Sequence, residues 1–112
     1  MNPSRKLLLC LSTVASAEDA ERIAAALIAQ SLAACVQIEG PIRSHYRWQG
    51  QTQCDQEYRL VIKSAVTVWE QLKSKLIDLH PYDEPQIVMI EIDDASDGYR
   101  DWVLAQTEHG TP

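Results

Sequence analysis

His80 is the side chain best suited to chemistry in this sequence, because a neutral imidazole is a common protein ligand for copper and zinc. Its surroundings are acidic: from Asp78 onward the chain has nine acidic residues and one basic residue, Arg100. Such a region accepts a cation more easily than a polyanion. A structural role is also open, since a histidine before Pro81 can bond a carbonyl or complement the dipole at a helix C-terminus.

Catalysis would have to use His80, Tyr82 or Lys63 as acid or base. The sequence pairs no nucleophile with a base at a recognisable spacing, and its four glycines are not grouped into a phosphate-binding loop. We therefore expect a protein that is not an enzyme.

The composition predicts one globular domain spanning residues 1–112, with residues 1–5 and 107–112 as flexible tails. Hydrophobic residues make up 46% of the chain and charged residues 23%, and the net charge is −6. Nucleic acid binding is not expected, because Arg43 and Arg47 are accompanied by Asp55 and Glu57 rather than by a clustered basic face.

The N-terminal sequence argues against export and membrane insertion. The apolar run Leu7 to Leu11 is shorter than a signal-peptide core or a membrane span. Cys10, Cys35 and Cys54 form an odd set without a Cys-x-x-Cys pair, which suits free thiols in a reducing compartment. We therefore expect a cytoplasmic protein.

Apolar periodicity predicts the elements that must position these residues. Four strands are expected: one at 6–14, a second that begins near 34, is interrupted at Gly40-Pro41 and continues over 42–48, a third at 57–63 and a fourth at 86–93. Helices are expected from Ser16, from a capping box of Thr67 and Glu70 to His80, and near Ser96. The order predicts an α+β, ferredoxin-like βαββαβ sandwich with an extra C-terminal helix.

Residues 42–63 are predicted to form a long antiparallel hairpin that turns at Gln49 to Gln51. Its first strand alternates between a moderately apolar face and a cationic face. The moderately apolar face holds Ile42, Ser44, Tyr46 and Trp48, and the cationic face holds Arg43, His45 and Arg47. Such an arm could extend past a small core.

Four stretches resemble the CutA divalent-cation-tolerance family in order and spacing over nearly the whole chain. They are Leu32-Ala33-Ala34-Cys35-Val36, Ser44-x-Tyr46-x-Trp48-x-Gly50, Glu57-x-x-Leu60-x-Ile62-Lys63 and His80-Pro81-Tyr82-x-x-Pro85-x-Ile87. The resemblance implies a homotrimer joined by its hairpins, with clefts between subunits and a role in tolerance of divalent metal ions, copper in particular. A trimeric scaffold or anchoring protein is the alternative that it implies.

The resemblance also implies which residues would surround the cleft. These are Trp48, Glu57, Lys63, His80 and Tyr82, with His80 as the metal ligand. Some metal-binding members carry a cysteine and a second histidine where this chain has Ser12 and Leu79. A ligand site is one interpretation of this set, and a polar and aromatic network that stabilises the trimer is the other.

Overall fold

The computed structural model describes residues 5–108, which form an α+β domain. Its elements are β1 (Leu7–Val14), α1 (Ala17–Ala29), β2 (Cys35–Trp48), β3 (Gln51–Ala65), the 3₁₀ turn η2 (Val66–Val68), α2 (Trp69–Leu79), β4 (Val88–Ile92) and α3 (Asp97–Gln106). The strand and helix order is the predicted one. Of the predicted tails, residues 1–4 and 109–112 lie outside the described range, whereas Thr107 is buried.

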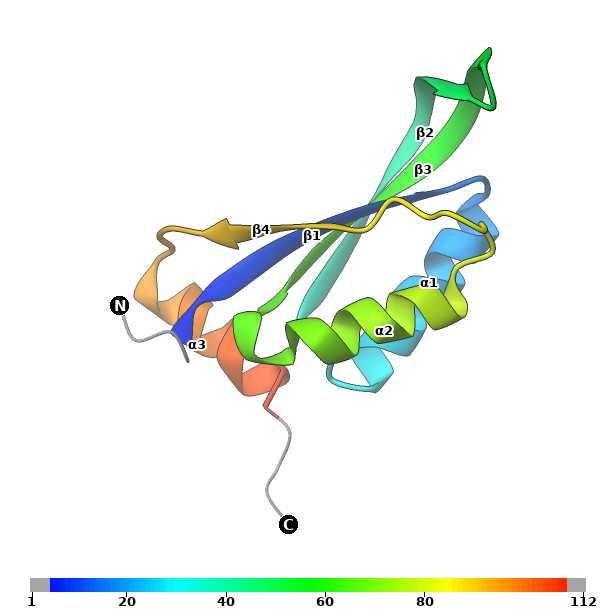
Figure 1. The fold of residues 1–112 in the computed structure, drawn as a ribbon. Coiled ribbons are helices and arrows are strands. Elements are labelled where there is room, and N and C mark those ends of the chain that lie inside the picture. Colours follow the sequence, from blue (N-terminus) through cyan, green and yellow to red (C-terminus); the bar gives the residue numbers. More distant parts are fainter. Residues whose placement is uncertain (1–4, 109–112) are drawn as a thin grey trace.

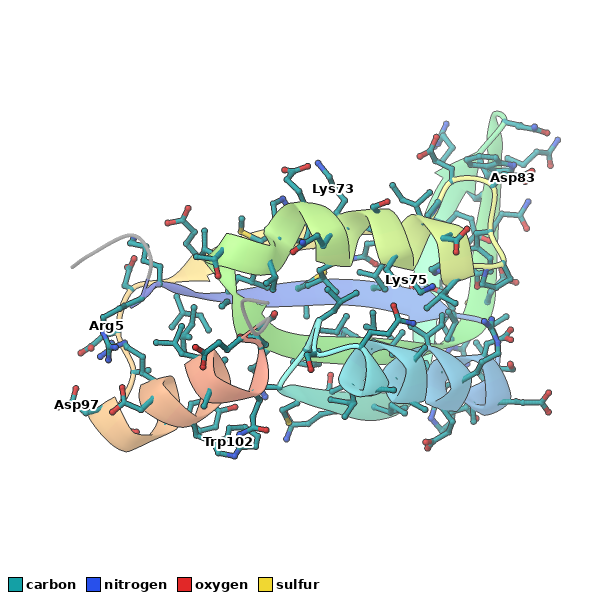
Figure 2. All side chains as sticks on the ribbon, turned by 90° about the horizontal axis from the view of Figure 1, so that it is seen from below. Arg5, Lys73, Lys75, Asp83, Asp97 and Trp102 are labelled. Carbon is teal, nitrogen blue, oxygen red and sulfur yellow. The ribbon has the colours of Figure 1, made fainter. Side chains whose placement is uncertain are left out.

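The four strands form one sheet in the order β2-β3-β1-β4, and every neighbouring pair is antiparallel. Helices α1 and α2 lie side by side on one face of this sheet (Figures 1 and 2). The core fills the space between them. Its fully buried members include Leu8 and Cys10 of β1, Leu60 and Ile62 of β3, Ile23 and Leu27 of α1, and Leu72 and Leu76 of α2.

The two helix starts differ in how their first amides are satisfied. Ser16 caps α1 as predicted, because its hydroxyl accepts a hydrogen bond from the Asp19 amide at 3.1 Å. The capping box predicted from Thr67 and Glu70 is wrong. Thr67 lies inside η2, and α2 begins only at Trp69, with no side-chain capping bond.

The hairpin of β2 and β3 extends well beyond the rest of the sheet (Figure 1). Pairing between these strands runs from Cys35–Lys63 to Trp48–Gln51, but β1 pairs only with residues 58–65 of β3. The interruption predicted at Gly40-Pro41 is a register shift, through which β2 continues. At the tip, Gln49 and Gly50 both have positive φ angles, 50° and 78°, as a tight hairpin turn requires.

The face of the sheet opposite the helices is apolar at its centre and open. Register places Leu11 beside Val88 and Leu9 beside Ile90. Val88 and Ile90 retain 43% and 50% of their exposure. Strand β4, which was predicted from Gln86 to Asp93, spans only Val88–Ile92, and its side chains Val88 and Ile90 remain about half exposed.

Helix α3 packs at the end of the sheet where β1 begins and β3 ends. Val103 is fully buried there, and the largely buried Arg100 contacts Asp94 and Asp97 at 3.3 Å. Trp102 lies on the outer side of this helix and points away from the sheet (Figure 2).

Candidate functional site

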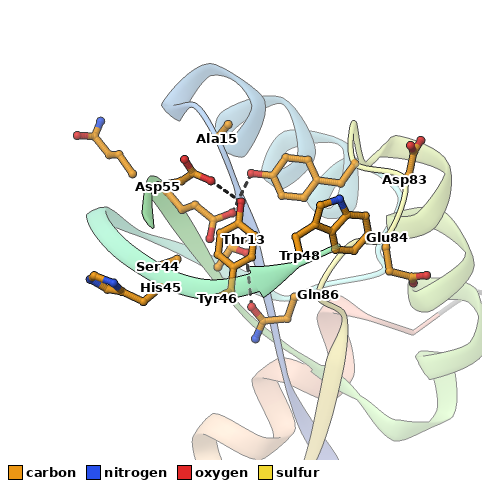
Figure 3. Close-up of a pocket in the computed structure, with 13 residues that line it drawn as sticks. Thr13, Ala15, Ser44, His45, Tyr46, Trp48, Asp55, Asp83, Glu84 and Gln86 are labelled. Atoms are coloured by element: carbon orange, nitrogen blue, oxygen red, sulfur yellow. Dashed lines mark hydrogen bonds between the residues drawn. The ribbon is translucent and has the colours of Figure 1, made fainter. Parts of the chain in front are cut away.

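A cleft of about 860 Å³ lies where the hairpin arm meets the end of β1 and the loop between α2 and β4 (Figure 3). Side-chain alternation along the hairpin directs Tyr46 and Trp48 of β2, and Asp55 and Glu57 of β3, to the same side. The loop begins at Pro81, where α2 can no longer continue, and supplies the opposite wall.

The lining of the cleft combines aromatic rings with carboxylates. The rings belong to Tyr46, Trp48 and Tyr82, and the carboxylates belong to Asp55, Glu57, Asp83 and Glu84. No lysine or arginine is among the described residues that line it. Carboxylates attract cations directly, and the faces of aromatic rings attract them through the quadrupole of the ring. The arrangement therefore suits a positively charged ligand.

His80 supports this cleft from behind rather than lining it. The imidazole is 8% exposed, and its Nε2 lies 2.8 Å from the carbonyl oxygen of Thr13. Its Nδ1 accepts the backbone N–H of Tyr82 at 3.1 Å. Because Nδ1 accepts, Nε2 must be the protonated nitrogen that donates to Thr13. Burial lowers the pKa of His80, so the ring is held neutral with both nitrogens occupied.

Tyr82 connects His80 to Glu57 by a ring contact and a hydrogen bond. The rings of Tyr82 and His80 are in contact, with their centroids 4.8 Å apart. The Tyr82 hydroxyl donates to Oε2 of Glu57 at 2.8 Å, and the Glu57 side chain is almost fully buried. Burial and the bond to Glu57 both raise the pKa of Tyr82, which therefore remains a hydrogen-bond donor.

A second tyrosine and carboxylate pair stands further out on the arm. The Tyr46 hydroxyl donates to Oδ2 of Asp55 across the two strands. This hydrogen bond is the main cause of the raised pKa of Tyr46. Trp48 lies beside the pair with about half of its surface exposed, so it presents a ring that a ligand could cover.

The structure brings together three of the five predicted site residues, namely Trp48, Glu57 and Tyr82. His80 is adjacent, and Lys63 is not. Lys63 follows Glu57 by six residues along β3, which is about 20 Å of strand, and its ammonium group donates to Gln37. Lys63 could meet this cleft only from another copy of the chain.

Among the aromatic and acidic residues that line the cleft, sequence reasoning missed four: Tyr46, Asp55, Asp83 and Glu84. The signal for the first two was the alternation they share with Trp48 and Glu57. The other two lie directly after the His80-Pro81-Tyr82 stretch, in a loop. The residue types of this loop do not predict that it runs back toward the arm.

The described residues do not form a copper centre around His80. Ser12, at the position where the family resemblance implies a cysteine in some members, is buried on the helix-covered face of β1, and its hydroxyl lacks a hydrogen-bond partner. Leu79 offers no ligand atom. Within residues 5–108, no group of three or more histidine, cysteine or acidic side chains is placed to hold a metal ion. Both His80 nitrogens are already hydrogen-bonded.

Fold and site together define a small α+β protein with an acidic, aromatic cleft. The family model of the CutA1 divalent ion tolerance protein matches residues 8–106. The chain therefore belongs to the CutA1 family.

Relatives with similar sequences align with almost the whole chain. Divalent-cation tolerance protein CutA of Thermus thermophilus is 42% identical over 97 residues, which are 87% of this chain and 94% of the relative. The protein of the same name from Pyrococcus horikoshii is 31% identical over 91% of this chain and 99% of the relative. The solved structure of CutA1 from Oryza sativa superposes with a TM-score of 0.91 at 29% identity and covers 97% of this chain and 100% of its own.

The names of these relatives point to tolerance of divalent cations rather than to an enzymatic reaction. They do not agree on a compartment. One relative, from Arabidopsis thaliana, is named chloroplastic, and a solved structure from Archaeoglobus fulgidus is titled periplasmic. In the described part of this chain, no helix is long and apolar enough to cross a membrane.

Proposed function

We propose that this chain is a non-enzymatic homotrimer of ferredoxin-like subunits that contributes to tolerance of divalent metal ions by binding a cationic ligand in the acidic cleft. The observation that carries the proposal is the lining, in which four carboxylates and three aromatic rings meet without a lysine or arginine. The three free thiols suit the cytoplasm as its compartment.

Two features support the trimer. The apolar open face around Val88 and Ile90 is the kind of surface that soluble proteins cover by association. The protruding hairpin has unpaired strand edges that a closed ring of copies would satisfy. Since the cleft lies at the base of this arm, assembly through the arm would bring a neighbouring copy close to the cleft.

The cleft carboxylates are better placed to hold a cation than His80. A metal ion on His80 would have to displace either the Tyr82 amide or the bond to Thr13. Asp55 and Glu57, in contrast, each offer a second carboxylate oxygen besides the one that accepts from a tyrosine. Oxygen donors favour manganese, magnesium and calcium, whereas copper would favour an imidazole.

Isothermal titration with manganese, zinc and copper separates the two locations. We expect the double change Asp55→Asn with Glu57→Gln to weaken binding at least about tenfold, because both charges are lost while the shapes remain. His80→Gln should retain binding, and Asp78→Asn, which removes an exposed carboxylate outside the cleft, serves as the control.

The opposite result, loss of binding in His80→Gln and retention in the double variant, would move the metal to His80. If none of the three metals binds the wild-type trimer, the cleft is not a divalent cation site.

A further inference from the structure

Cys54 is an exposed thiol in a cluster of basic side chains on the hairpin, on the face directed away from the ring cluster of the cleft. It pairs across the strands with His45, whose Nε2 lies 3.5 Å from its sulfur. A guanidinium nitrogen of Arg43 also donates to this sulfur, at 3.5 Å. Figure 3 shows His45 pointing away from Tyr46 and Trp48.

The charged side chains on the face of the hairpin that carries Cys54 are basic. Arg43, His45 and Arg47 alternate along β2, so they share the face on which Cys54 lies. Their cross-strand partners are Gln56, Cys54 and Thr52, none of which carries a negative charge. The acidic residues of β3, Asp55 and Glu57, lie on the other face of the hairpin and line the cleft.

The other two cysteines do not share these properties. Cys10 is fully buried in the core, and burial raises its pKa to about 12, so it stays protonated and out of reach. Cys35 is partly covered at the start of β2. Cys54 is the exposed thiol among the three, and nothing in the packing of the core requires a cysteine at its position.

A soft metal ion is a weaker reading of the same cluster. The separation of 3.5 Å between sulfur and Nε2 would suit two ligands of one tetrahedral ion. However, such sites take three or four protein ligands, and the third side chain in contact with this sulfur is the guanidinium of Arg43, which is not a metal ligand. A cationic surround repels a metal ion and attracts an anionic reagent.

We propose that Cys54 is a thiol–disulfide exchange site for anionic low-molecular-weight disulfides of the glutathione type. The Cys54 thiol loses its proton to His45 or to water, and the resulting thiolate attacks one sulfur of the disulfide. The bond between the two sulfurs of the reagent breaks, and its second half leaves with the electron pair. That half takes up the proton as a free thiol, so Cys54 is oxidised to a mixed disulfide as the reagent is reduced. Arg43 stabilises the negative charge on the attacking sulfur.

This proposal goes beyond the cation cleft and does not depend on it. The Cys54 side chain lies on the other face of the same arm, although its neighbour His45 also borders the cleft, and its ligand has the opposite charge. A failure of the metal titration would leave this proposal standing, because its readout is covalent modification of Cys54 and not metal binding.

The test uses the full-length protein in its native assembly state and three disulfides that differ in charge. Glutathione disulfide is anionic, 2-hydroxyethyl disulfide is neutral and cystamine is cationic. Intact mass and peptide mapping should show one glutathione per chain, on Cys54, and none on Cys54→Ser. The rate should fall in the order anionic, neutral, cystamine, with the extremes at least about fivefold apart at low salt.

The double variant Arg43→Gln with Arg47→Gln should bring the three rates together, and Cys35→Ser should keep the wild-type order. Raising the salt concentration on the unmodified chain should have the same levelling effect, which tests the charge even if the double variant folds poorly. Equal rates at low salt, modification at Cys35 in place of Cys54, or no modification of the native protein would each overturn the proposal.

Discussion

His80 holds the loop after α2 against the end of β1 through two backbone hydrogen bonds. Its Nε2–H donates to Thr13 and its Nδ1 accepts from Tyr82, so one ring joins two segments that are far apart in the sequence. The ring can make both bonds only in its neutral form. The sequence left a structural role for His80 open, and these two hydrogen bonds describe such a role. They also make the position of Tyr82 dependent on His80.

This geometry predicts how stability changes with pH. Because burial lowers the pKa of His80 in the folded state, the unfolded chain binds a proton more readily. The contribution of His80 to the free energy of unfolding is therefore complete above about pH 6.5 and is lost as the pH falls below that value. Urea unfolding at pH 7.5 and 5.5 should show a smaller pH-dependent loss in His80→Gln than in the wild type.

His45→Gln is the matched control, since it removes an exposed histidine and leaves His80 in place. It should keep the pH dependence of the wild type. An identical pH dependence in His80→Gln and the wild type would show that the ring is not held neutral by the fold.

The Tyr82 hydroxyl stabilises a carboxylate that the fold removes from water. In Tyr82→Phe, Glu57 would remain almost fully buried without this donor, so we expect a loss of about 1–3 kcal/mol in the free energy of unfolding. Chemical denaturation measures this loss of stability. Tyr46→Phe removes the exposed hydroxyl that bonds Asp55 and should change stability much less. Equal losses of stability in Tyr82→Phe and Tyr46→Phe would contradict the burial of Glu57.

The sequence predicted individual site residues better than it predicted their grouping. Trp48 and Glu57 were expected at the cleft from the family resemblance, because alternation within each strand does not say which faces of the two strands coincide. The pairing of Glu57 with Tyr82 depends on the path of the loop after Pro81, which connects segments separated by 25 residues. No local sequence pattern encodes a contact between segments so far apart, so this hydrogen bond could not be predicted from the sequence.

At the scale of elements, the base of the hairpin depends on a close contact of its backbone. A Cβ atom on Gly40 would lie 2.4 Å from Cδ2 of the Tyr58 ring, far inside normal contact distance. Tyr58 packs against the core and cannot move away freely. Gly40→Ala should therefore destabilise the fold by about 1–3 kcal/mol in chemical denaturation.

Gly98→Ala is the control for this prediction. It lies in α3 with no atom near its added methyl group, so it should leave stability unchanged or raise it by up to about 1 kcal/mol. If Gly40→Ala proves as stable as Gly98→Ala, the Tyr58 ring has room that the structure does not show.

Element order was predictable because apolar periodicity is strong in β1, α1 and α2. The residues at which elements begin and end were less predictable. The Thr67 and Glu70 pattern has the spacing of a capping box, but the chain leaves β3 through the 3₁₀ turn η2, which delays α2 to Trp69. Strand β4 is shorter than its apolar run because its pairing with β1 covers only residues 88–92.

At the scale of the molecule, the proposed trimer makes a prediction about the open sheet face. Ile90→Lys places a charge in the centre of this face and should shift the protein toward monomers in sedimentation velocity, because a buried unpaired ammonium is costly. Ile77→Lys is the control. Ile77 is more exposed than Ile90, at 58%, but lies on α2 on the other side of the sheet, and its change should leave the assembly intact.

A wild-type chain that sediments as a folded monomer at low concentration would contradict the trimer. Dissociation by both lysine variants alike would mean that the sheet face is not the specific contact.

The turn at Gln49 and Gly50 has a consequence for how the hairpin can change in evolution. It fixes which residues oppose one another, so it decides that rings and carboxylates line one side of the arm while Arg43, His45 and Cys54 occupy the other. Deleting one residue from either strand would exchange the two sides beyond that point. Homologues that vary the length of this arm should therefore gain or lose residues in steps of two per strand, or else carry a bulge that restores the phase.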